Sequence, residues 1–241
     1  MQQPTPQSTL THLMATRYAD ALCILWAGSV SKNQGTPTSD LDLVIIYPKL
    51  TQAYREAFIY EGWPIDAFVH DPETLAYFLT QVDPPSSGLA SMIVEGIELT
   101  PPSPYSNSLK KQAASLLTSS PPLKPDDLYN RCFQITDLLD DLANPTSPHA
   151  NWAIRAELYR QLAEFYLLSN GQWIGSGKIL VRLLERYNIN KAQQFFEAFT
   201  HGTYKEVEQL TLEVLEPQGG LLWDGYVTRA SLTYRVTKDI T

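Results

Sequence analysis

Residues 27–46 read AGSVSKNQGTPTSDLDLVII, and the strongest indications of both fold and chemistry lie in this segment. An apolar run, ALCILWAG (21–28), leads into it and is typical of a buried strand that ends at Gly28. A second run, LDLVIIY (41–47), contains Asp42 as its one charged residue. Two short buried strands joined by a turn rich in Gly, Thr, Pro and Ser predict a small sheet here.

The junction Gly28-Ser29 has the features of a phosphate-binding turn. Glycine lets a phosphate approach the backbone, and the segment VSKNQG (30–35) can start a helix whose exposed N–H groups attract anions. The hydroxyl of Ser29 adds a further donor. We therefore expect an anion to bind directly after the first strand.

Three aspartates predict a metal site next to this turn. Asp40 and Asp42 start the second strand, and side chains two positions apart point to the same face. Such carboxylates repel each other unless a cation joins them, and Mg²⁺ prefers carboxylates together with substrate phosphates. Asp66, the only charge in WPIDAFV (63–69), fits as a third ligand from a neighbouring strand. The alternatives are a turn or cap role for Asp40 and a solvated edge-strand position for Asp66.

The spacing of these residues resembles a known family. Gly28-Ser29, nine intervening residues and then Ser39-Asp40-Leu41-Asp42-Leu43 resemble the signature of the DNA polymerase beta-like nucleotidyltransferase superfamily. The likeness is to its small bacterial members, the minimal nucleotidyltransferases and the kanamycin-type aminoglycoside nucleotidyltransferases. It covers residues 15–100 clearly and the remainder weakly.

The resemblance implies roles for individual residues. Gly28 and Ser29 would hold the β- and γ-phosphates of a nucleotide, with Ser39 beside them. Asp40, Asp42 and Asp66 would bind two Mg²⁺ ions, and Asp66 would help activate the acceptor. Many relatives have arginine where this chain has Lys32, which can meet a phosphate as a point charge but without a bidentate fork.

The resemblance also implies an α+β fold, in which a small mixed-sheet, polymerase beta-like palm domain is followed by a helical domain. Proline clusters at 101–104 and 121–125 favour a boundary, which we place between 1–103 and 104–241. Before it, we expect a helix over 8–20, a hairpin turning at Glu61-Gly62, and a helix opening at Asp71-Pro72. After it, apolar residues recur at helical spacing, and SNSLKKQAASLLTSS (106–120) reads as a connecting helix.

Two features of the later half are weaker functional candidates. GQWIGSGK (171–178) departs from the P-loop spacing and reads as a loop between helices, from which Lys178 could still reach a triphosphate. Glu157 and Glu164 lie seven positions apart on one helix face. Kanamycin-type relatives use a glutamate of their helical domain as general base, although its position cannot be matched here, and the alternative is a surface rim on a packed helix.

Composition and charge exclude several classes of protein. The formal net charge is −8, and residues 1–100 hold 4 basic against 11 acidic residues, so a protein that tracks duplex nucleic acid is not expected. The chain lacks an apolar stretch of about 18 residues, and its first residues do not resemble a secretory signal. Two isolated cysteines favour neither disulfides nor a thiolate metal site. We therefore expect a cytoplasmic protein without membrane partners.

The sequence thus predicts an Mg²⁺-dependent nucleotidyltransferase that moves a nucleoside monophosphate, AMP from ATP, to a hydroxyl of a small acceptor. The acidic first half would suit a cationic acceptor such as an aminoglycoside. The helical domain would bind that acceptor. Two alternatives stay open: transfer to a protein hydroxyl, and a non-catalytic nucleotide-binding regulatory module. The acceptor, the choice of nucleotide and the oligomeric state are not written in the sequence.

Overall fold

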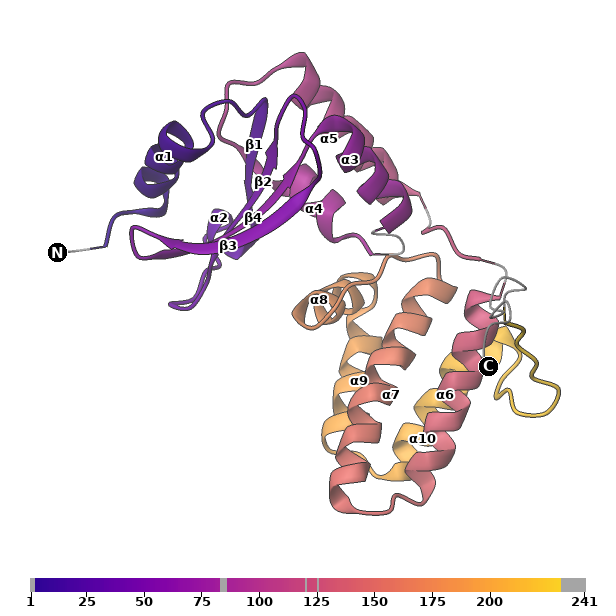
Figure 1. Cartoon of the computed structure of the whole chain (residues 1–241). Helices are drawn as coiled ribbons and strands as arrows, with labels where there is room; N and C mark the ends of the chain where they lie inside the picture. Colours follow the sequence, from indigo (N-terminus) through magenta and orange to yellow (C-terminus); the bar gives the residue numbers. More distant parts are fainter. Residues whose placement is uncertain (1–2, 83–85, 120, 125, 231–241) are drawn as a thin grey trace, which may run out of the picture. The chain divides into compact units, whose positions relative to one another are not determined.

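The computed structural model describes residues 3–82, 86–119, 121–124 and 126–230. The chain divides into two compact units, Met1–Pro121 and Pro122–Thr241 (Figure 1). The first contains a five-stranded sheet with helices, and the elements described in the second are helices, which confirms the predicted α+β class. Among the described helices, none combines the length and the hydrophobicity that crossing a bilayer requires.

The first unit is built around its sheet. In chain order its elements are α1 (Pro6–Arg17), β1 (Cys23–Ala27), α2 (Gly28–Ser31), β2 (Leu41–Ile46), β3 (Tyr54–Tyr60), β4 (Trp63–His70), α3 (Pro72–Tyr77), η1 (Phe78–Val82), α4 (Gly88–Glu95), β5 (Ile97–Glu98) and α5 (Pro104–Thr118). The strand order is β3-β4-β2-β1-β5. Only β2 and β4 pair in parallel, so the sheet is mixed.

Helices cover both faces of this sheet (Figure 1). On one face, Leu10 and Leu13 of α1 pack against alternate strand residues such as Ile24 and Leu43. On the other face, α3, α4 and α5 pack against the intervening residues, among them Val44. Because side chains alternate along a strand, Asp42 lies on the same face of the sheet as Val44. This face is therefore apolar along β2 and becomes acidic where the strand begins.

Local sequence signals explain where the elements begin and turn. The Thr5 side chain caps α1 by accepting from the Ser8 N–H, so the helix begins earlier than the predicted 8–20. Glu61 and Gly62 both have positive φ, as a two-residue hairpin turn requires. Asp71 caps α3 by accepting from the Thr74 N–H. The hairpin and the start of α3 lie where the sequence predicts them.

The second unit is a helical bundle with a single apolar core. Its elements are α6 (Asp127–Ala143), α7 (Pro148–Ser169), α8 (Lys178–Tyr187), α9 (Ile189–Thr200), α10 (Tyr204–Leu215) and η2 (Glu216–Gln218). The predicted stripes of α6 and α7 form the centre of this core, where Ile135, Leu158, Leu162 and Phe165 are fully buried. Helical periodicity therefore identified the buried faces correctly.

The boundary between the units differs from the predicted one. It falls at 121/122 instead of 103/104, and the predicted connecting helix, α5, belongs to the first unit. Leu109 and Ala113 of α5 pack in the core that covers the sheet. Proline marks where a helix begins, and Pro104 does so here, but it carries no information about the core against which that helix packs.

Candidate functional site

Three acidic side chains converge at the beginning of β2. The parallel register of β2 and β4 pairs Asp42 with Asp66, and on its other side Asp42 pairs with Ala27 at the end of β1. Asp40 directly precedes β2, which begins at Leu41. One carboxylate oxygen from each of Asp40, Asp42 and Asp66 lies within 4.8 Å of the other two. The convergence predicted from the sequence is confirmed.

This cluster fits a divalent cation. Its donors are three carboxylates, and hard cations such as Mg²⁺ prefer oxygen ligands of this kind. Asp66 is almost fully buried, whereas Asp40 and Asp42 are half-buried, so the cluster opens to solvent on one side. A partly open carboxylate site leaves room for substrate oxygens to complete a coordination sphere.

Gly28 brings the backbone of the predicted phosphate turn against these acids. Its φ is +80°, and a Cβ atom at this position would lie 1.8 Å from Oδ2 of Asp42. Only glycine suits both the backbone angle and the close approach. The adjoining helix α2 has four residues, so its dipole is small and an anion here would meet the N–H groups of the turn itself.

The loop that follows holds Ser29 and Ser39 together. The Ser29 hydroxyl donates to the hydroxyl oxygen of Ser39 at 3.3 Å, and that oxygen accepts from the Thr36 N–H at 2.8 Å. The two serines of the family-like signature are thus neighbours in space, although ten positions separate them. Their contact with phosphate remains a prediction.

Lys32, predicted to meet a phosphate, pairs with Glu95 of α4. Both side chains are about 40% exposed, at 39% and 42%. An exposed ion pair contributes little to stability, so a triphosphate could replace Glu95 as the partner of Lys32. The structure leaves the predicted contact of Lys32 open to test.

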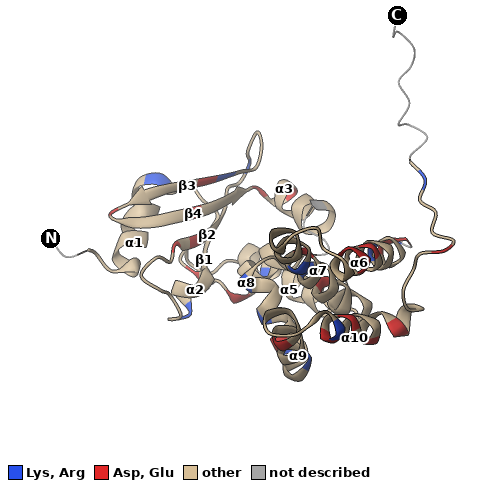
Figure 2. Cartoon of the chain, turned by 90° about the horizontal axis from the view of Figure 1, so that it is seen from below, with Lys and Arg blue, Asp and Glu red and all other residues tan. Residues whose placement is uncertain are grey.

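Arg55 is part of this site and was missed in the sequence analysis. It lies in β3, and its guanidinium donates from Nε to Oδ1 of Asp66 at 2.8 Å and from Nη2 to Oδ2 at 2.6 Å. Figure 2 shows acidic positions where β2 lies beside β1, while β3 carries charges of both signs. Arg55, Asp40 and Asp66 line a hollow of about 590 Å³ whose other walls include Ile59 and Pro64. In the sequence, the one feature that could have pointed to Arg55 is that it is a basic residue inside a predicted strand.

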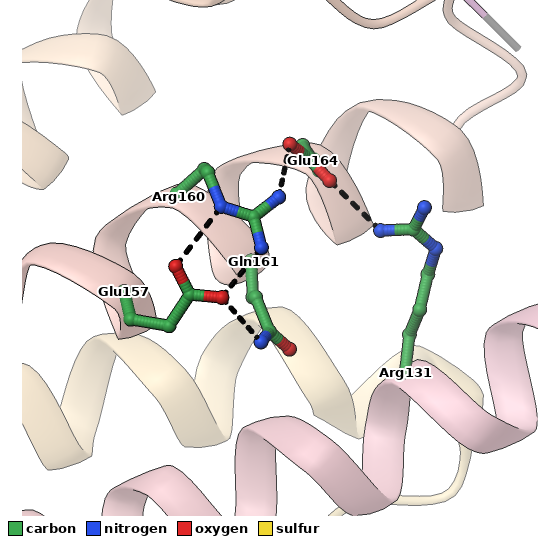
Figure 3. Close-up of polar contacts among 5 residues, drawn as sticks. All are labelled: Arg131, Glu157, Arg160, Gln161 and Glu164. Atoms are coloured by element: carbon green, nitrogen blue, oxygen red, sulfur yellow. Dashed lines mark hydrogen bonds and ion pairs between the residues drawn. The ribbon is translucent and has the colours of Figure 1, made fainter. Parts of the chain in front are cut away.

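The two glutamates considered as general bases are both paired with arginine (Figure 3). Glu164 is buried, accepting from Arg160 at 2.7 Å and from Arg131 of α6 at 2.9 Å. Glu157 accepts from Arg160 and from Gln161, and these bonds lower the pKa of Glu157. A lowered pKa makes a weaker base, and two arginines engage both oxygens of Glu164. This arrangement favours structural roles for both.

Glu164→Gln is therefore expected to destabilise the helical unit, by about 1–3 kcal/mol, because two arginines lose the buried charge that they share. Urea unfolding of the second unit measures this. Glu157→Gln is the matched control, since its side chain is 43% exposed, and it should cost less than about 1 kcal/mol. If Glu164→Gln instead removed an activity while leaving the unfolding midpoint unchanged, Glu164 would be a catalytic group.

Lys178 lies in the second unit, at the first residue of α8. Residues 170–177 connect α7 to α8, as the sequence predicts for a loop that only resembles a P-loop. Gly177 precedes Lys178 with a φ of +53° and caps the helix without a side-chain bond. A contact between Lys178 and a nucleotide remains a prediction.

The helical unit contains a pocket of its own, of about 560 Å³, between α7, α8 and α9. Aromatic and aliphatic side chains make up most of its lining, and Arg155 and Glu185 add one charge of each sign; the rings belong to Trp152, Tyr159, Phe196 and Phe199. Such mixed apolar walls with a few polar groups are typical of small-molecule sites.

Comparison with known proteins adds little to this picture. No family model matches the chain, and no curated protein does. Among solved structures, it is similar to a nucleotidyltransferase-like protein from Exiguobacterium sibiricum 255-15, with 13% identity and a TM-score of 0.44. The match covers 88% of this chain and 74% of the other. At these values nothing about activity follows from the likeness, and the fold class rests on the sheet and helices described above.

Proposed function

We propose that the protein is a divalent-metal-dependent nucleotidyltransferase that transfers AMP from ATP to a hydroxyl group of a small acceptor. The observation that carries the proposal is the convergence of Asp40, Asp42 and Asp66 within 4.8 Å beside the backbone of Gly28. Acidic ligands next to a turn that can receive phosphate are what a transfer of a phosphorus group requires.

The proposed division of roles follows the position of each residue. Asp40, Asp42 and Asp66 would hold Mg²⁺, which supplies the positive charge that offsets the negative charge of the transferred group. Gly28 and Ser29 would bind the β- and γ-phosphates, which fixes the α-phosphorus near the acids. The acceptor oxygen would then form its bond to the α-phosphorus while its proton passes to the carboxylate of Asp66, and the bond to pyrophosphate would break, with pyrophosphate as the leaving group.

The helical unit is the proposed acceptor-binding part. The pocket between α7, α8 and α9 supports this, because its apolar walls, four of them aromatic side chains, and its two opposite charges suit a small organic molecule with polar groups. The net charge of the chain, −8, also favours approach of a cation. An aminoglycoside is the acceptor class that we propose to test first.

A transfer assay with two labels tests the activity. The protein is incubated with Mg²⁺ and ATP labelled at the α- or the γ-phosphate, together with an aminoglycoside, an uncharged polyol or no acceptor. We expect the α-label on the small acceptor and the γ-label in pyrophosphate. A labelled protein band would show the protein-directed alternative instead. Nucleotide binding without transfer to any acceptor would favour the regulatory module, and both outcomes would overturn the proposal.

Mg²⁺ with a non-hydrolysable ATP analogue should raise the melting temperature of the first unit. At 100 times the dissociation constant, ligand binding stabilises the folded state by about 2.7 kcal/mol, which corresponds to a shift of several degrees. The double variant Asp40→Asn, Asp42→Asn should lose the shift, because the analogue's phosphates then lack the metal that bridges them to the protein. Scanning calorimetry measures both melting temperatures. An equal rise in the melting temperature of both proteins would mean that the nucleotide binds elsewhere.

A further inference from the structure

Arg55 forms a bidentate contact with Asp66, the third acid of the cluster. Its Nε and Nη2 donors meet the two oxygens of Asp66 at 2.8 and 2.6 Å, so each oxygen accepts a charge-assisted hydrogen bond. The guanidinium also lies over the ring of Phe68, with Cζ 4.5 Å from the ring centroid. Phe68 pairs with Arg55 across β3 and β4, so the sheet register itself holds the arginine in this position.

The charge of Arg55 acts on the whole cluster. Its guanidinium donates to both oxygens of Asp66, and the carboxylate of Asp66 has an oxygen within 4.8 Å of an oxygen of Asp40 and of Asp42. Three carboxylates with oxygens within 4.8 Å of one another repel strongly unless a cation offsets their charge. The other basic side chain of this region, Lys32, pairs with Glu95. Among the described residues, Arg55 is therefore a cation placed to offset the negative charge of this cluster, through its contact with Asp66.

We propose that Arg55 is the built-in counter-cation of the three-acid cluster and that a divalent ion must compete with it for Asp66. The counter-cation role depends only on the contacts of Arg55. The competition with a divalent ion rests on the proposed function, because it assumes that the cluster binds metal. Both halves assign Arg55 a positioning role that the family-like signature does not contain.

Arg55 and a divalent ion would compete because both need the carboxylate oxygens of Asp66. Both accept from Arg55, so an ion that takes one of them weakens a donor contact of the guanidinium. The Asp66 side chain is 12% exposed, whereas that of Arg55 is 63% exposed and borders the 590 Å³ hollow, so the arginine is the partner with room to move. Once released from Asp66, the guanidinium of Arg55 can form a bidentate pair with a phosphate. Metal alone should then bind weakly, and metal with nucleotide more tightly.

The test of competition is a titration with Mn²⁺ in the absence of nucleotide, followed by electron paramagnetic resonance. Arg55→Gln keeps hydrogen-bond donors but removes the charge, and it should bind Mn²⁺ about 10-fold more tightly than the wild type. Arg17→Gln is the matched control, because Arg17 pairs with Glu56 outside the cluster, and its affinity should equal that of the wild type. Unchanged or weaker binding by Arg55→Gln would overturn the competition.

The counter-cation role is tested without metal, by melting in the presence of EDTA. Arg55→Gln should lower the melting temperature of the first unit by a few degrees, since it removes the positive charge that Asp66 contacts. Adding Asp66→Asn should recover most of this loss, as a double-mutant cycle would show for coupled groups. Additive effects of the two substitutions would overturn this role. If none of the proteins bound Mn²⁺, the metal site and the competition would both be wrong, while the cycle would still decide the counter-cation role.

Discussion

Asp42→Asn is expected to reduce nucleotidyl transfer by at least about 10³-fold. Asp42 lies at the centre of the cluster, between Ala27 of β1 and Asp66 of β4, so its carboxylate is close to Gly28 and within 4.8 Å of an oxygen of the third acid. Asparagine has nearly the same shape but no charge, and it binds hard cations more weakly. Loss of a metal-binding carboxylate removes several kcal/mol of charge stabilisation, and each 1.36 kcal/mol corresponds to a factor of ten in rate.

The measurement is the release of labelled pyrophosphate from ATP under saturating acceptor. Asp20→Asn is the matched control, since Asp20 is an exposed aspartate of the same unit outside the cluster, and it should keep full activity. Circular dichroism should show that both variants fold, because the core residues of β2 are unchanged. Activity of Asp42→Asn within about tenfold of the wild type would mean that the cluster is not the catalytic centre.

The acids could be predicted from the sequence because their signals are local. Asp42 is an isolated charge in an apolar run, and Asp66 is another, so each was recognisable within a window of seven residues. The period of two along a strand then places Asp40 and Asp42 on one face. The structure adds the parallel register that sets Asp42 beside Asp66, which joins residues 24 positions apart.

Arg55 could not be predicted in the same way. It belongs to an edge strand whose alternating exposure is typical of a solvated face, and a basic residue there is ordinary. Arg55 belongs to the site because it pairs with Asp66. The two residues meet because β3 folds back on β4 at the Glu61-Gly62 turn. The hairpin was predictable, but the diagonal contact across it depends on side-chain geometry that a one-dimensional pattern does not contain.

Glu164 shows the same limit in the helical unit. A glutamate beside a buried apolar stripe is usually part of a solvated rim, and the spacing of Glu157 and Glu164 is compatible with that position. Its burial depends on Arg131, which lies 33 positions earlier on another helix. Buried charges are tolerated when they are paired, so their burial is decided by tertiary packing and not by local spacing.

Gly28→Ala is expected to have the second large effect, a loss of transfer of at least about 10²-fold together with lower stability of the first unit. Alanine at a φ of +80° costs roughly 1–2 kcal/mol, because its Cβ crowds the following carbonyl. In addition, that Cβ would lie 1.8 Å from Oδ2 of Asp42, so the carboxylate must move. The same methyl group therefore strains the phosphate turn and displaces the central acid.

Gly225→Ala, in the second unit, is a control for the general cost of alanine at a positive φ. Gly225 has the same φ, +80°, but a Cβ there would have open space around it. The control thus carries the backbone strain without the collision, and it should leave transfer unchanged. For Gly28→Ala, calorimetry with Mg²⁺ and the ATP analogue should show nucleotide affinity reduced in parallel with turnover. If Gly28→Ala retained both, the close approach of turn and carboxylate would play no part in the chemistry, and the phosphates would have to bind at another edge of the sheet.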